Sequence, residues 1–156
     1  MDALQLLMWS ILLYVAGGVA SLLLARQEDL AIKVAGLSAM AGGLLGLASA
    51  VTALTGAQTL QWQAVGPFAF AHFIVRMDSL AAFMVLVISL LVTVCGLYSL
   101  SYVREYVGKG VGAMGFFMNL FIASMVGLVV MDNAFWFIVL FEICLLYTSD
   151  AADDLT

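Results

Sequence analysis

Charged residues are scarce in this sequence: Asp, Glu, Lys and Arg together make up 10% of its 156 residues, whereas hydrophobic residues make up 65%. Soluble domains average roughly a quarter charged residues. A soluble domain this apolar could not cover its surface, so the composition indicates a membrane protein. Backbone polar groups in lipid must be satisfied internally, and the long unbroken apolar runs favour spanning helices over a closed barrel.

Several chemical signatures are also missing. The two cysteines lack the paired spacing of a disulfide framework or a thiolate metal site, and Cys95 is expected to be a small buried hydrophobe. No basic block, phosphate-cradling loop, zinc spacing or nucleophile elbow occurs. The sequence therefore predicts no metal, no cofactor and no nucleic-acid partner, and a lipid bilayer as its surroundings.

Four segments reach the roughly 20 apolar residues that cross a hydrocarbon core. A fifth apolar run starts near Ala134 and soon meets an acidic tail, whose Asp150, Asp153 and Asp154 carry much of the net charge of −5. The expected fold is all-α transmembrane, with four full spanning helices and a truncated fifth. The four full segments are Leu4 to Ala25, Ala31 to Thr55, Leu80 to Val103 and Val111 to Met131.

The connections between these segments differ in length. The first and third, "RQEDLAIK" and "REYVGKGVG", are short enough to predict tight turns between antiparallel helices. The second runs from Gly56 to Asp78 and places strand-forming residues on both sides of Gly66-Pro67, which predicts a small β-hairpin on the membrane face with Trp62 at the interface. His72 lies in this connection, as a structural hydrogen-bonder or, alternatively, a proton relay.

Basic residues indicate the orientation. Four of the five lysines and arginines flank the first and third connections, and Arg76 alone flanks the second. The positive-inside rule then places the first and third connections in the cytoplasm and the N-terminus outside. The four are Arg26, Lys33, Arg104 and Lys109.

Small residues recur at intervals of four in the second segment, at Gly42, Gly46 and Ala50. Such a face lets two helix backbones approach closely. Ordinary packing within the chain and an interface with a partner subunit both fit this pattern.

Glu142 is the acidic residue inside the fifth apolar run. If that helix begins near Ala134, eight residues at about 1.5 Å each place the carboxyl roughly 12 Å deep in a core of ~30 Å. A charge at the bilayer centre costs about 2.5 to 3.5 kcal/mol, and such residues commonly mark ion or proton paths. The alternative is a helix that stops early and leaves Glu142 at the interface. Asp78 and Asp132, by contrast, precede apolar segments and are expected to cap helices.

The stretch "FFMNLFIASMVGLVVMDNAFWFIVLFE" resembles the superfamily of complex I antiporter-like subunits, formate hydrogenlyase membrane subunits and Mrp-type cation/proton antiporters. "MDALQL" and "RMDSL" are similar to its hydrogenase-4 branch. The resemblance implies a bundle of about fourteen or more helices in a bacterial inner membrane, assembled with other membrane and hydrophilic subunits. Residues 1–142 would be its N-terminal part, inactive without the remaining helices.

The same resemblance gives Glu142 a role, because the family's proton-carrying glutamate falls on the "LFE" motif. It implies a proton-translocating, non-catalytic subunit of a hydrogenase-4 or complex I-like redox complex. The alternative is an Mrp-type antiporter subunit without redox coupling. In the family this glutamate pairs with a lysine two helices later, whose charge can tune the carboxylate's proton affinity.

The end of the chain departs from the family pattern. "CLLYTSDAAD", from Cys144 to Asp153, matches residue for residue the in-frame translation of TGT-CTC-TTA-TAC-ACA-TCT-GAC-GCT-GCC-GAC, a transposase mosaic end with its adapter. Ile143 fits the same origin. Residues 143–156 are therefore expected to be a non-native, adapter-encoded tail.

Overall fold

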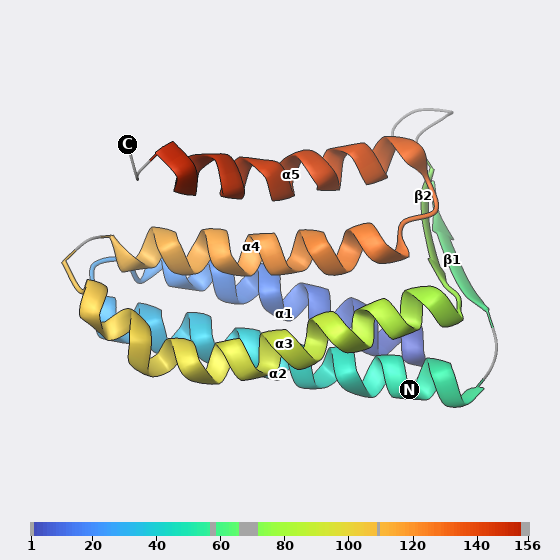
Figure 1. Cartoon of the computed structure of the whole chain (residues 1–156), viewed down its shortest axis with the longest axis horizontal. Coiled ribbons are helices and arrows are strands. Elements are labelled where there is room, and N and C mark those ends of the chain that lie inside the picture. Colours follow the sequence, from blue (N-terminus) through green and yellow to red (C-terminus); the bar gives the residue numbers. More distant parts are fainter. Residues whose placement is uncertain (1, 57–58, 66–71, 109, 154–156) are drawn as a thin grey trace.

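A computed structural model describes residues 2–56, 59–65, 72–108 and 110–153, with side chains described as far as Leu145. Its five helices run side by side, and a two-stranded sheet lies across one end of the bundle (Figure 1). Four helices are long and apolar enough to span a membrane, and α5 has a shorter apolar stretch, Ala134–Leu145. The predicted fold is confirmed. The helices are α1 (Ala3–Leu23), α2 (Glu28–Gly56), α3 (Ser79–Tyr102), α4 (Val111–Val130) and α5 (Ala134–Asp153).

The helix boundaries differ from the predicted ones in two places. α2 begins at Glu28, so all of the expected first turn except Arg26 and Gln27 is helical. Glu28 and Asp29 are favoured in the first turn of a helix by the helix dipole. α5 continues to Asp153 instead of ending with the apolar run. Ala and Leu in the tail are good helix formers, which sustains the helix without further apolar periodicity.

The predicted hairpin is present. Strands β1 (Leu60–Ala64) and β2 (Phe73–Met77) pair antiparallel, with Trp62 opposite Val75. The Gly66-Pro67 turn lies outside the described residues. The sheet lies where α3 begins and α4 ends, whereas the α1–α2 and α3–α4 turns lie at the opposite end (Figure 1). Arg76 is thus separated along the bundle from Arg26, Lys33 and Arg104, while Lys109 is not described.

The first three helices pack through small residues on α2. A Cβ atom added to Gly42 would come within 2.5 Å of the Tyr14 ring on α1, and one added to Gly46 would overlap Ser89 on α3. Both glycines and Ala50 are buried within this chain. Of the two interpretations of the small-residue face, packing inside the chain is the one that the structure realises.

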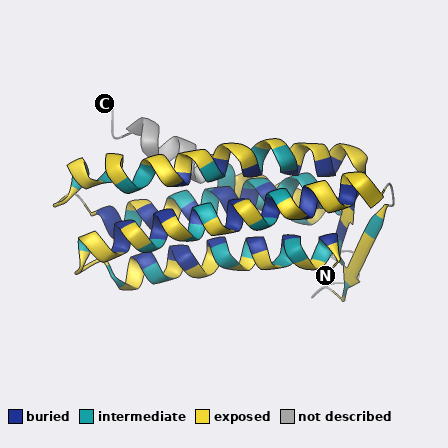
Figure 2. Cartoon of the chain, turned by 90° about the horizontal axis from the view of Figure 1, so that it is seen from below, coloured by how far each residue is buried: buried dark blue, intermediate teal, exposed yellow. Residues whose placement is uncertain are grey.

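Serine hydroxyls reinforce this packing by hydrogen-bonding backbone carbonyls of neighbouring helices. Ser10 Oγ donates to Gly42 O at 2.7 Å and Ser49 Oγ donates to Ala3 O at 2.6 Å, both between α1 and α2. Across the bundle, the buried residues lie along the helix interfaces, and large apolar side chains cover the outside (Figure 2). An outer surface of this kind suits lipid.

Cys95 lies on that outer surface of α3, so the expectation that it is buried is wrong. In a soluble protein an apolar residue of this kind points inward, but a membrane helix is apolar on its lipid side as well. Apolarity alone could not tell the two faces of α3 apart.

Candidate functional site

Glu142 lies in the ninth position of α5, which begins at Ala134. At about 1.5 Å per residue, its Cα is roughly 12 Å along the helix axis from the first residue. The helix continues beyond Glu142, but it does so through residues 143–153, which are expected to be a non-native tail, so the depth of Glu142 in the membrane stays a prediction. Glu142 lies within the apolar stretch Ala134–Leu145 of α5.

One face of α5 packs against α4. The half-buried residues of α5 recur at helical spacing, and Leu140 lies so close to α4 that a Cβ on Gly127 would come within 3.2 Å of its Cδ1 atom. Ser124 Oγ and Cys144 Sγ are 2.9 Å apart across the same interface. The half-buried residues are Trp136, Val139, Leu140, Ile143 and Cys144.

Glu142 lies outside this packed face and is exposed in the isolated chain. Among the described residues, no side chain donates a hydrogen bond to its carboxylate or forms an ion pair with it. Among the described basic residues, Arg26, Lys33 and Arg104 lie at the end of the bundle with the α1–α2 and α3–α4 connections, and Arg76 lies in β2. None of them forms a salt bridge with Glu142. A carboxylate in this position needs a polar partner if it is to remain in a hydrocarbon core.

Asp78 and Asp132 lie at the sheet end of the bundle. Asp78 Oδ1 accepts a 2.8 Å hydrogen bond from Ala81 N in the first turn of α3, which is N-cap geometry. The Asp132 carboxylate instead lies 3.9 Å from Arg76, and Asn133 Oδ1 accepts the hydrogen bond from Phe135 N at the start of α5.

A surface groove of about 420 Å³ brings Arg76, Asp78 and Asp132 together above apolar residues of α3, α4 and α5. Its acidic pair lacks a third ligand of the kind that holds a metal ion: among the described residues, no group of three His, Cys, Asp or Glu could bind one. The predicted polar residues thus occupy two places, this groove and the middle of α5.

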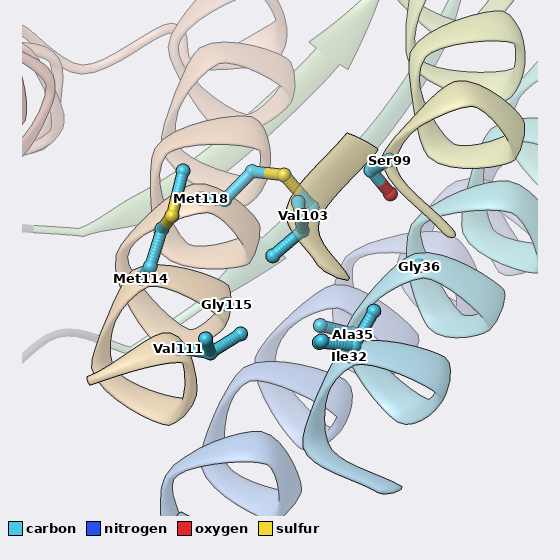
Figure 3. Close-up of a pocket in the computed structure, with 9 residues that line it drawn as sticks. All are labelled: Ile32, Ala35, Gly36, Ser99, Val103, Val111, Met114, Gly115 and Met118. Carbon is cyan, nitrogen blue, oxygen red and sulfur yellow. The ribbon is translucent and has the colours of Figure 1, made fainter. Parts of the chain in front are cut away.

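A second cavity, at the opposite end of the bundle, lies among α2, α3 and α4 (Figure 3). Its volume is about 20 Å³, enough for a single water molecule, and its lining is almost entirely apolar. The Ser99 hydroxyl on its wall already donates to Gly96 O at 2.8 Å. This cavity is too small and too apolar for a substrate or cofactor.

Asn119 is a buried polar residue that the sequence interpretation missed. Its side chain is fully buried and donates to Ala35 O at 3.2 Å and Gly115 O at 3.0 Å, while Ser38 Oγ donates to its Oδ1 atom. The sequence does contain a signal for a buried polar residue here, because Asn119 is an amide in the middle of the apolar run "FFMNLF". Through these hydrogen bonds Asn119 joins α2 to α4, so it is a structural residue of the bundle.

The chain is similar to hydrogenase-4 component B of Escherichia coli (strain K12). The two sequences are 61% identical over 142 residues, which cover 91% of this chain and 21% of the relative. The chain therefore spans about a fifth of the length of hydrogenase-4 component B. No protein-family model matches it.

Proposed function

We propose that residues 1–142 are the N-terminal part of a proton-translocating membrane subunit of a hydrogenase-4 or complex I-like redox complex. The carboxylate of Glu142 carries the proposal, since it lies within the apolar stretch Ala134–Leu145 of α5, on a flank that the described residues do not cover. The identity with a hydrogenase component favours redox coupling over an Mrp-type antiporter. In this proposal the electron-transfer chemistry belongs to partner subunits.

A carboxylate inside a membrane can carry a proton when a neighbouring cation changes its proton affinity. A nearby positive charge favours the ionised form, and its movement away lets the acid take up a proton. The described residues offer Glu142 no such cation. We infer that the cation comes from helices beyond this chain and that the 156 residues alone do not translocate protons.

We also propose that residues 143–156 are not native. The alignment with hydrogenase-4 component B extends over 142 of the 156 residues, the length of the proposed native part. Resequencing the source DNA through codon 143 tests this directly. A reading frame that continues into apolar helix supports the proposal, and an encoded "CLLYTSDAADDLT" before a stop codon contradicts it.

For the orientation, we propose an inner-membrane protein with its N-terminus and hairpin outside. Arg26, Lys33 and Arg104 lie at the end of the bundle opposite Arg76, as the positive-inside rule requires of cytoplasmic turns. The hairpin would then face the outer side of the membrane.

The decisive substitution is Glu142→Gln in the full-length protein, assembled with its partner subunits in vesicles. It keeps the size of the side chain and removes its charge, so we expect proton transport to fall by about tenfold or more while the complex still assembles. Glu105→Gln, an exposed position in the α3–α4 turn, is the matched control and should keep transport within about twofold. Transport at the unsubstituted level in Glu142→Gln would refute the role of Glu142.

A further inference from the structure

The start of α5 is attached to the hairpin by three kinds of contact, which we call the outer clamp: the contacts between β2 and residues 131–136. Asp132 N donates to Ile74 O at 2.9 Å, and Val75 forms a single β-bridge with Met131. The ring of Phe73 meets the ring of Trp136 edge to face at 5.5 Å. Backbone, aromatic and charged groups thus converge on one short segment.

The charged part of the outer clamp is the weakest. Arg76 and Asp132 are 3.9 Å apart and both about half exposed, so water screens their attraction. The aromatic part is better supported, because Phe73 is also held edge to face by Trp62 of β1 at 6.1 Å. Phe73 therefore links the two-stranded sheet to α5.

α5 depends on this attachment more than the other helices do. α2 is packed against α1, α3 and α4, whereas α5 packs mainly against α4. A helix held along one side can tilt or rotate about that contact unless its end is fixed. The outer clamp supplies a second, separate point of attachment.

Trp136 and Glu142 belong to the same continuous helix. Glu142 is six positions after Trp136, or about 9 Å along the helix axis. Trp136 lies on the half-buried face that packs toward α4, and Glu142 lies on the exposed flank. Because a helix moves as a rigid rod over this length, fixing Trp136 fixes both the depth and the direction of the Glu142 side chain.

We propose that Phe73 and Trp136 are positioning residues, which hold α5 so that Glu142 faces its cationic partner. The inference rests on the proposed function of Glu142. It also gives the hairpin a role. The hairpin orients α5, and α5 carries the titratable group, Glu142. The position of α5 can be measured without measuring transport.

The experiment uses the full-length protein in its complex, with Cys95 replaced by Ala and a cysteine pair at Gly127 and Leu140, where α4 and α5 approach closely. Oxidant-driven disulfide formation between them reports the position of α5. We expect Phe73→Ala to slow cross-linking about threefold or more and to lower transport, and Phe73→Tyr, which keeps the ring, to restore both. Phe83→Ala removes an exposed ring on α3 and is the matched control.

Arg76→Gln is a second variant, which leaves the aromatic contacts intact and should slow cross-linking by less than about twofold. Unchanged cross-linking in both Phe73→Ala and Trp136→Ala would overturn the inference, whatever happens to transport. Slower cross-linking with full transport would also overturn it, because the position of α5 would then be irrelevant to Glu142. Failure of the Glu142→Gln experiment alone would instead count against the proposed function.

Discussion

The α1–α3 bundle and the α5 helix differ in the residues that form their contacts. In α1–α3, glycines and serines allow close approach, and side-chain hydroxyls bond to backbone carbonyls of neighbouring helices. The apolar part of α5 has no glycine and carries large side chains, several of them exposed, with Glu142 among them. The difference teaches that α1–α3 is held together by close backbone contacts within this chain, whereas α5 packs against α4 along one face only.

The largest effect is expected at Gly42, where α1 and α2 approach closely. Gly42→Leu would drive a side chain into the Tyr14 ring, and overpacking at a backbone contact should cost about 3 kcal/mol or more, enough to prevent the bundle from accumulating. Leu44→Val, at an exposed position of α2, is the control and should change stability by less than about 1 kcal/mol. Thermal unfolding in detergent compares the two; equal melting temperatures would show that the close approach of α1 and α2 is unimportant.

The next largest effect is expected at Asn119, because its side chain connects α2 to α4. Asn119→Leu should destabilise the protein by about 1 to 2 kcal/mol, since it removes the hydrogen bonds that Asn119 forms with Ala35 O and with Ser38 Oγ, although Ser38 Oγ can still donate to Ala35 O. Combining it with Ser38→Ala should give less than the sum of the two single effects. Strict additivity in this double-mutant cycle would mean that the two side chains are not coupled.

The smallest effect concerns the start of α3. Asp78→Ala removes the side-chain acceptor of Ala81 N and should cost about 1 kcal/mol, whereas Asp78→Asn keeps an acceptor oxygen and should cost only a few tenths. Thermal unfolding of the two variants distinguishes a capping role from a charge role. If both variants lose the same stability, the charge of Asp78 rather than its capping bond is what matters.

The same contrast explains what the sequence could predict. The spans of α1, α3 and α4 follow from apolar length, and their predicted boundaries lie within about two residues of those in the structure. The hairpin follows from strand-forming residues around Gly66-Pro67. The outer clamp could not be predicted, because the pairing of Ile74 with Asp132 joins segments distant in sequence and neither segment carries a local signal for it.

The candidate site shows a similar limit. The depth of Glu142 follows from counting residues along α5, but its direction does not, because both sides of a membrane helix are apolar. Only the contact of Leu140 with Gly127 of α4, which does not involve the tail, shows which face of α5 is covered. The cation that we propose for Glu142 is not among the described residues, so neither the sequence nor the fold of this chain could identify it.

A proton-carrying Glu142 must change its protonation state during turnover. Infrared difference spectroscopy of the full-length complex, recorded between resting and reducing conditions, reports this through the carboxylic acid C=O band. We predict a band that changes on turnover and is absent from the Glu142→Gln variant, but not from Glu105→Gln. The same difference spectrum in the unsubstituted protein and in Glu142→Gln would contradict the account.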